Sequence, residues 1–421
     1  MDAINEVDTN ITELLMFILL NIISLSINAI PSILIGFSAV VFQFYAIKTW
    51  AVLRFFGLAV GFLLIRWTFT IIKRPNMTMQ VNASTDHYKL LKSALMVPVV
   101  ICIYMCDFKG IWFEKLSKTI NNGISLMDVG VIGFVFVNAF SKNIPMYSIL
   151  SKKAIFMFIM GFIRLVVVKR LNYEVEISEY GKHLNFYFIL GILEQLHNLY
   201  KRIFKLFYLF DTVVGSSLLY CFYRFTSFKV KEIRNNFIEQ NIEGLYSIVP
   251  LFALFLIVND FGRKYDKIKW RYFFTLIYFT CFAFLFVCYS VCFKHKNLCI
   301  ENIKLVFTEK DVSYVSRRAT NLGYILWSLF ICYFTFLSTF TLCKIYPHAI
   351  HHNLLVDYIS KNMLLVFLTA NLGIILSKFM KYEETINPVK VNLIYLFCVF
   401  VLCGGVKNFF TFKKQQKTKR N

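Results

Sequence analysis

The apolar segments of this chain are too numerous for one water-soluble core. Roughly thirteen runs of mostly hydrophobic residues follow one another, the first from about Leu14. The later runs lie near 32–47, 51–72, 91–106, 127–141, 154–168, 184–199, 204–223, 246–259, 272–293, 322–343, 362–379 and 391–411. A membrane-spanning helix needs about 20 apolar residues, and several runs are shorter than this. The pattern predicts an all-α fold: a polytopic membrane bundle of roughly 13 helices, with residues 1–421 as a single membrane-embedded domain.

Composition supports the same class. Hydrophobic residues make up 58% of the chain and charged residues only 17%, and the mean hydropathy is +0.60. The formal net charge of +22 could indicate a nucleic-acid partner. The lysines and arginines, however, stand in short groups between apolar runs and form no basic face. We therefore expect them to anchor helix ends at lipid headgroups, and we expect no nucleic-acid binding.

The two ends of the chain predict an orientation. The N-terminal tail, residues 1–13, is acidic, and the apolar run behind it lacks the features of a signal peptide. The C-terminal tail, residues 412–421, is the most basic segment, which predicts that it is cytosolic. Lys417 and Lys419 have the spacing of a dilysine retrieval signal. These features favour a multi-pass protein of the endoplasmic reticulum membrane, although a Lys-rich tail also produces this spacing by chance.

Cysteine usage and common motifs exclude several chemistries. Ten of the eleven cysteines lie in or at the ends of apolar runs, without C-x-x-C pairs or histidines at ligand spacing. They are expected to be packing residues, and no metal site is predicted. The sequence also shows no phosphate-binding glycine loop and no hydrolase or metalloprotease motif. A nucleotide-driven pump is therefore disfavoured.

Charged residues gather in the loops between certain apolar runs. Asp107, Glu114, Lys115, Lys118 and Asp128 stand within about twenty residues. The topology above brings this cluster to the same membrane face as three other polar loops, at 171–188, 239–244 and 311–327. Ionisable groups packed between membrane helices mark functional sites, whereas a short charged loop is otherwise a solvated interface. We expect these four loops to assemble one site.

The same loops carry a family resemblance. The segment I-S-E-Y-G-K-H-L-N-F-Y-F resembles E-Y-G-x-H-x-N-F-F of the glucosaminyl-phosphatidylinositol inositol acyltransferases, the PIG-W family of GPI-anchor biosynthesis. S-L-M-D-V-G-V-I-G-F-V-F resembles that family's M-D-x-G-V-G-x-F-V-F, V-S-R-R-A-T-N-L-G-Y-I-L-W its S-R-R-x-A-N-L-x-x-x-x-W, and N-I-E-G its N-R-E-G. The four motifs occur in the family's order, over roughly residues 86–380.

The resemblance implies an enzyme that moves a fatty acyl group, usually palmitoyl, from acyl-CoA to an inositol hydroxyl of glucosaminyl-phosphatidylinositol. Acyl-CoA is then a co-substrate, the glycolipid and the bilayer are partners, and no tightly bound cofactor is expected. An alcohol that attacks a thioester needs a base for its proton and a donor for the developing oxyanion.

The family's catalytic pair maps onto Asp107 and Lys118. We expect Asp107 to act as the general base, and Lys118 to keep Asp107 ionised and stabilise the oxyanion. His183 is the other candidate base, since a neutral imidazole suits pH 7, although a lone histidine at a span boundary is more often structural.

The other residues that match family motifs are expected to bind glucosamine, inositol phosphate or the CoA phosphates. The arginines suit phosphate best, or they anchor a helix end to lipid. Asp128, with Gly130, is alternatively part of a tight, capped helix entry. The predicted substrate-binding residues are Asp128, Glu179, Tyr180, Asn185, Asn241, Glu243, Arg317, Arg318 and Asn321.

The chain departs from the family pattern at three points. Lys109 stands where the family has a proline, and Ile242 replaces the arginine of N-R-E-G. The interval from Asp107 to Lys118 is one residue longer than in the family, which leaves Lys115 as an alternative cation.

Two other protein classes share parts of the pattern. A chemoreceptor-like channel has similar length and aromatic content, but about seven spans and no reason to carry these motifs. A secondary transporter has a similar span count, but is expected to show broken helices or a two-half repeat, which the sequence lacks.

Overall fold

The computed structural model describes thirteen stretches of the chain. They are residues 18–19, 21–22, 25, 83–106, 117–120, 123, 125–140, 151–170, 176–204, 210–230, 233–264, 315–345 and 354–379. The chain divides into two compact units, one formed by residues 1–8 and 118–333 and the other by 9–117 and 334–421. The described residues of each unit are helices and connecting turns, without a strand, so an all-α architecture is confirmed for this part of the chain.

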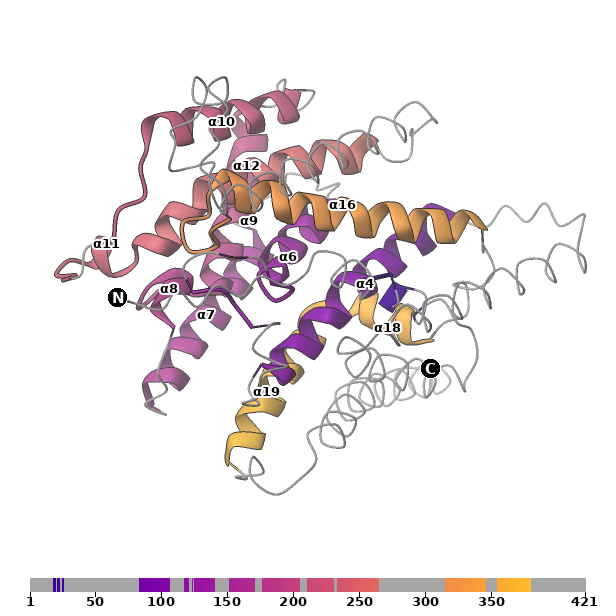
Figure 1. The fold of residues 1–421 in the computed structure, drawn as a ribbon, viewed down its shortest axis with the longest axis horizontal. Helices are drawn as coiled ribbons and strands as arrows, with labels where there is room; N and C mark the ends of the chain where they lie inside the picture. Colours follow the sequence, from indigo (N-terminus) through magenta and orange to yellow (C-terminus); the bar gives the residue numbers. More distant parts are fainter. Residues whose placement is uncertain are drawn as a thin grey trace, which may run out of the picture. The chain divides into compact units, whose positions relative to one another are not determined.

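The unit of residues 118–333 contains most of the described helices (Figure 1). They are α6 (Val129–Phe140), α7 (Lys152–Arg170), α8 (Ile177–Tyr180), α9 (Phe186–Ile203), α10 (Asp211–Phe225), α11 (Phe237–Gln240), α12 (Ile242–Lys264) and the first part of α16 (Leu322–Ile345). The longer ones agree closely with the apolar runs of the sequence. α12 is central, because it packs against α6, α9 and α10 and also contacts α8.

Glycines allow the closest helix contacts in this unit. A Cβ on Gly215 of α10 would lie 2.7 Å from the carbonyl oxygen of Ala253 in α12. A Cβ on Gly191 of α9 would meet the ring of Phe158 in α7 at 2.9 Å. Without a hydrophobic driving force between helices in lipid, such small residues let backbones approach and gain dispersion contacts. These contacts fix how α7 and α10 pack onto α9 and α12.

One face of α7 is apolar and exposed. Ile159, Phe162, Ile163 and Val166 are 51%, 61%, 49% and 54% exposed. In a water-soluble protein such a continuous apolar surface is unusual, but it suits a helix that faces lipid. The opposite face of α7 packs on α9 through Gly161 and Met157.

A buried carboxylate joins the start of α10 to the ends of α9 and α12. Asp211, at the start of α10, is fully buried and pairs with Arg263 of α12 at 2.6 Å and with Lys201 of α9. The ends of α9 and α12 and the start of α10 therefore meet at Asp211.

The second unit is built around α4 (Ala83–Met105), which packs against α18 (Leu354–Lys361) and α19 (Met363–Phe379). The Ser93 hydroxyl donates to the Val356 carbonyl at 3.2 Å. The His87 ring contacts the Phe336 ring edge-on with centroids 4.8 Å apart, and its Nε2 lies 3.0 Å from the Thr339 hydroxyl.

Among the described residues, two helices are long and apolar enough to cross a membrane, Ile242–Arg263 and Leu322–Cys343. Val129–Phe140 and Met363–Leu372 are shorter apolar helices. The predicted runs near residues 14, 32–47, 51–72, 272–293 and 391–411 lie wholly or largely outside the described residues. The total of roughly 13 spans, and the single-domain organisation, therefore stay predictions.

Candidate functional site

The short helix α8 and the turn behind it form the centre of the candidate site. Gly181 follows α8 with φ +89°, which L side chains rarely adopt. A Cβ at this position would also lie 2.4 Å from the Asn241 backbone. The Lys182 N–H then donates to the Gln240 carbonyl at 2.9 Å. The E-Y-G-K-H-L-N segment is thus docked on α11 and the start of α12.

Three asparagines of the family motifs bond to backbone groups. Asn185 is the N-cap of α9: its Oδ1 accepts from the Tyr187 and Phe188 N–H groups, and its Nδ2 donates to the Gly161 carbonyl at 3.0 Å. Asn241 Oδ1 accepts from the N–H groups of His183 and Leu184 at 2.7 and 3.0 Å. Such buried amides hold loops in place.

Asn321 holds the fourth loop in place in the same way. Its Oδ1 accepts from the Ser316 and Tyr324 N–H groups at 3.1 and 2.9 Å, at the start of α16. All three asparagines were predicted to bind substrate. The structure shows their side chains bonded within the protein, which gives each of them a positioning role.

Lys118 and Glu179 join the first and second polar loops. The Lys118 Nζ forms an ion pair and hydrogen bond with Glu179, whose side chain is 15% exposed. Burial would raise the pKa of Glu179, but Lys118, Arg317 and Arg164 together lower it to about 2. Glu179 is therefore ionised at neutral pH, and its charge holds Lys118 at this position.

Asp128 and Arg317 form a second, buried ion pair. Arg317 Nε lies 2.9 Å from Asp128 Oδ1, and the two side chains are 7% and 2% exposed. The Thr119 hydroxyl donates to Asp128 Oδ2 at 2.8 Å, and Arg317 donates to the Thr119 carbonyl at 3.1 Å. The Tyr324 hydroxyl donates to the Asp128 carbonyl at 2.7 Å. This pair ties the loop before α6 to the loop before α16.

Burial sets the electrostatics of this pair. It raises the pKa of Asp128, while Arg317 and the Thr119 hydroxyl oppose that rise. Burial alone would lower the pKa of Arg317, but the Asp128 and Glu179 carboxylates raise it, so the guanidinium stays charged. Arg317 was expected to bind phosphate or to anchor a helix end to lipid. Its buried ion pair with Asp128 shows that Arg317 supports the fold, and its predicted contact with phosphate or lipid stays a prediction.

Glu243 joins the third and fourth loops and is fully buried. Arg234 binds it in a bidentate pair, with donor distances of 2.9 and 2.7 Å. Arg318 donates to the same carboxylate through Nε and Nη2 at 3.3 and 3.2 Å. Arg234 was not among the residues predicted from the sequence. Arg234 lies in none of the four quoted motifs, so only its contact with Glu243 in the structure identifies it as part of the site.

His183 lies between α8 and α9 and is half-buried. Its Nε2 is 3.0 Å from Gln240 Oε1, and its ring stacks on Phe237 with centroids 5.8 Å apart. The Gln240 amide nitrogen donates to the Arg234 carbonyl at 3.3 Å, so Gln240 Oε1 is the acceptor and His183 Nε2 carries a proton.

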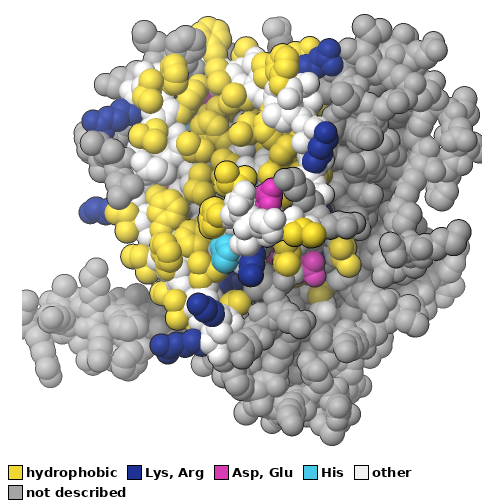
Figure 2. All heavy atoms as spheres, turned by 90° about the vertical axis from the view of Figure 1, so that its left-hand side faces the viewer, with side chains coloured by type: hydrophobic (Ala, Val, Ile, Leu, Met, Phe, Trp, Pro, Cys, Tyr) yellow, Lys and Arg dark blue, Asp and Glu magenta, His cyan; other side chains and the backbone are white. Residues whose placement is uncertain are grey.

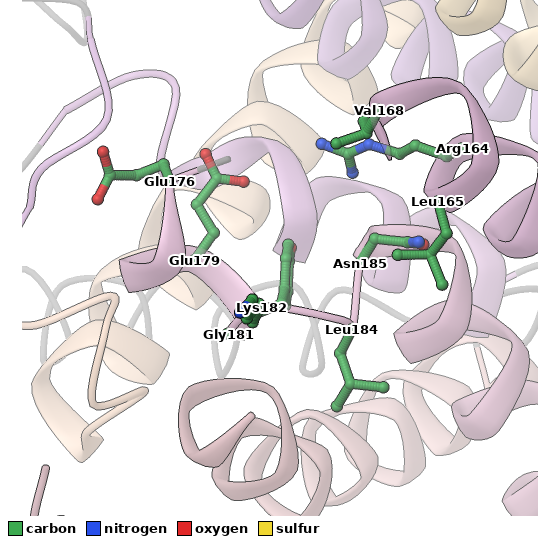
Figure 3. Close-up of a pocket in the computed structure, with 10 residues that line it drawn as sticks. Arg164, Leu165, Val168, Glu176, Glu179, Gly181, Lys182, Leu184 and Asn185 are labelled. Carbon is green, nitrogen blue, oxygen red and sulfur yellow. The ribbon is translucent and has the colours of Figure 1, made fainter. Parts of the chain in front are cut away.

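Two hollows flank α8. The smaller encloses about 330 Å³ and is lined by Arg164, Glu176, Glu179, Tyr180 and Asn185, among others. Figure 3 shows Arg164 extending from α7 toward the side where Glu176 and Glu179 lie. The larger, of about 1260 Å³, is lined in part by Glu176, Lys182, Arg234, Gln240 and Arg318. His183 is not among the residues that line either hollow.

The described residues of all four polar loops thus meet within one unit. Lys118 and Asp128 come from the first loop, Glu179 and His183 from the second, Asn241 and Glu243 from the third, and Arg317, Arg318 and Asn321 from the fourth. Asp107 and Lys115 lie outside the described residues, so the predicted Asp107–Lys118 pairing stays a prediction. In the part of the chain that the structure describes, no three His, Cys, Asp or Glu side chains form a metal-binding group.

The two helices of spanning length among the described residues and the exposed apolar face of α7 indicate a class, the membrane proteins. The chain belongs to the GWT1 family, whose sequence model matches residues 4–405. This confirms the resemblance that the four motifs indicated.

Curated relatives agree with the family assignment. The phosphatidylinositol-glycan biosynthesis class W protein of Dictyostelium discoideum is 26% identical over 377 residues, covering 74% of this chain and 71% of the relative. GPI-anchored wall transfer protein 1 of Schizosaccharomyces pombe is 28% identical over 338 residues, covering 73% and 69%. The protein of the same name in Kluyveromyces lactis is 31% identical over 193 residues, covering 42% and 43%.

Proposed function

We propose that this protein is an acyltransferase of GPI-anchor biosynthesis in the endoplasmic reticulum membrane. It moves a fatty acyl group, for which palmitoyl is the first candidate, from acyl-CoA to an inositol hydroxyl of glucosaminyl-phosphatidylinositol. The observation that carries the proposal is the GWT1 family match over residues 4–405, together with a relative that is named for phosphatidylinositol-glycan biosynthesis and another named for GPI-anchored wall transfer. The meeting of four motif-bearing loops beside two hollows supports it.

The reaction makes one bond and breaks one. The inositol oxygen attacks the thioester carbonyl carbon, a base takes the hydroxyl proton, and the carbon–sulfur bond breaks as CoA leaves and is protonated. The developing oxyanion needs a fixed positive group. Lys118 suits this role because Glu179, ionised at neutral pH, holds its ammonium group while about a third of the side chain stays exposed.

Asp107 and His183 remain the two candidate bases. The His183 ring is clamped between Phe237 and Gln240, which suits a residue that positions α8 against α11. Because the family's catalytic pair maps onto Asp107 and Lys118, we propose Asp107 as the base and His183 as a positioning residue.

The test is acyl transfer from radiolabelled palmitoyl-CoA to glucosaminyl-phosphatidylinositol, in membranes of cells that lack their own enzyme. Asp107→Asn and Lys118→Ala are expected to lose at least about 99% of the activity, because a general base and an oxyanion donor each contribute roughly 10²-fold or more. His183→Gln is expected to lose less.

Three outcomes change this assignment. Activity retained in Lys118→Ala but lost in Lys115→Ala moves the cation to Lys115. Activity retained in Asp107→Asn but lost in His183→Gln makes His183 the base. An inactive wild-type protein that is folded and in the right membrane contradicts the proposed function.

A further inference from the structure

The larger hollow beside α8 carries more positive than negative charge. Lys182, Arg234 and Arg318 line it together with one carboxylate, Glu176. Glu243 lies behind the two arginines and is fully buried. Among the described residues at this hollow, three cations against two carboxylates leave a surplus of one positive charge, which favours an anion.

Glu243 holds two guanidinium groups at the wall of this hollow. A guanidinium has five N–H donors in a fixed fork, and Arg234 uses two of them on Glu243. A fork whose orientation is fixed in this way binds a second oxyanion, such as phosphate, with little loss of side-chain entropy. The site is therefore preorganised for a phosphate group.

Arg234 lies beside a position where the chain departs from the family motif. Position 242, directly before Glu243, is isoleucine where the quoted motif N-R-E-G has arginine. In this chain a guanidinium nevertheless lies beside Glu243, because Arg234 reaches it from the segment before α11. A positive charge therefore lies beside Glu243 although residue 242 carries none.

The surroundings of the hollow suit a ligand that is anchored in lipid. Ile233, Phe237 and Ile238 are 75%, 59% and 64% exposed, in the segment that joins α10 to α12. α12 is one of the two spanning-length helices, so its start, and with it this segment, belongs at a membrane surface. Figure 2 shows charged side chains and a histidine gathered in a small polar region with hydrophobic side chains around it.

We propose that this hollow binds the phosphate group of a substrate and that Arg234 is one of its binding residues. The inference rests on the proposed function for the identity of the substrates. The apolar surroundings favour the phosphodiester of the glycolipid acceptor, while the phosphates of acyl-CoA share the same chemistry. Arg234 is assigned here to substrate binding, and the acyl-transfer chemistry is left to Lys118 and the base.

The test uses full-length protein in membranes and compares Arg234→Gln and Arg234→Lys with the wild type. Glu243 keeps Arg318 when Arg234 is replaced, so the variants do not leave a buried carboxylate without a cation. Lys229→Gln is the matched control, because it removes a positive charge from an exposed residue of the same segment that does not line the hollow.

Arg234→Gln is expected to raise the KM for the glycolipid about tenfold or more, as loss of a charge-assisted hydrogen bond predicts, with kcat within about threefold. The KM of Arg234→Lys for the glycolipid is expected to lie between those of the wild type and Arg234→Gln, and the KM of Lys229→Gln is expected to match the wild type. A rise confined to the KM for acyl-CoA supports the phosphate site and assigns it to CoA. Unchanged KM values for both substrates overturn the inference.

A second measurement separates this inference from the proposed function. Inorganic pyrophosphate at millimolar concentration is expected to raise the Tm of the purified wild-type protein, and to do so less in Arg234→Gln, whether or not acyl transfer occurs. Equal stabilisation of both proteins overturns the phosphate site. An inactive wild type that still shows this difference contradicts the proposed function alone.

Discussion

Replacement of Arg317 by glutamine is expected to destabilise the fold far more than the same change at its neighbour Arg318. Arg317 is the cation of the buried pair with Asp128, and both side chains are less than a tenth exposed. Breaking a buried pair by removing one partner costs about 3–5 kcal/mol, because an uncompensated charge stays behind. The Arg318→Gln control leaves Glu243 with its bidentate Arg234 pair, so we expect a cost of about 1 kcal/mol.

Thermal unfolding of the purified protein in detergent measures this difference. Cys102, Cys332 and Cys343 are buried and form no disulfide, so a thiol-reactive dye reports their exposure on unfolding. For a chain of 421 residues the unfolding entropy is about 0.9 kcal/mol/K, so a loss of about 3 kcal/mol lowers Tm by roughly 3 °C. The double variant Asp128→Asn, Arg317→Gln removes both charges and is expected to recover part of this loss.

The pH dependence gives an independent check on the cause. Without Arg317, the pKa of Asp128 rises further above its ordinary value, because the cation that opposed burial is gone. A carboxyl whose folded-state pKa is raised favours folding at low pH, and this advantage is lost as pH rises through that pKa. The Tm deficit of Arg317→Gln should therefore be smaller at about pH 5 than at about pH 7. Equal Tm values for the Arg317 and Arg318 variants would refute the reasoning.

Two further predictions concern α8. Since Lys118 and Arg317 depress the pKa of Glu179 to about 2 from 4.5, its contribution to stability is present above about pH 4.5 and lost as pH falls toward 2. The Tm of Glu179→Gln should accordingly fall less than that of the wild type between about pH 5 and pH 3, and parallel Tm curves would contradict this. Gly181→Ala should unfold at a clearly lower temperature than the wild type. Its positive φ costs an alanine about 1–3 kcal/mol of strain, and the added Cβ would lie 2.4 Å from the Asn241 backbone. Gly133→Ala, where a Cβ meets nothing within 4 Å, is the control, and similar Tm values for the two variants would count against the strain.

Family membership separates this chain from the channel and transporter alternatives more firmly than span counting does. The apolar runs agree with the described helices because a helix in lipid satisfies its own backbone hydrogen bonds, so length and hydropathy suffice to place it. The short run at 127–141 corresponds to α6. The run at 204–223 corresponds to α10, which begins at Asp211 and ends at Phe225.

The charged site was predictable only as a set of loops. The sequence correctly grouped the loops around Lys118, Glu179, Glu243 and Arg317 into one assembly. It did not predict which carboxylate pairs with which cation. Lys118 was assigned to Asp107, and in the structure Glu179 is its described partner.

Hydropathy along the chain therefore determined the described helices, because each helix depends on residues close to it in sequence. Asn185, Asn241 and Asn321 were predicted as substrate ligands, and the contacts of Asn241 with residues 57–58 positions away depend on the fold. Tertiary packing alone decided which charged side chains form ion pairs and which of them are buried. Arg317 and Arg318 are adjacent in sequence, yet Arg317 is buried against Asp128 while Arg318 reaches Glu243 at the hollow. Arg234 carries no motif and enters the site only because the segment before α11 folds back onto the start of α12. An ion pair joins residues distant in the chain, and its energy depends on burial that only the assembled bundle provides.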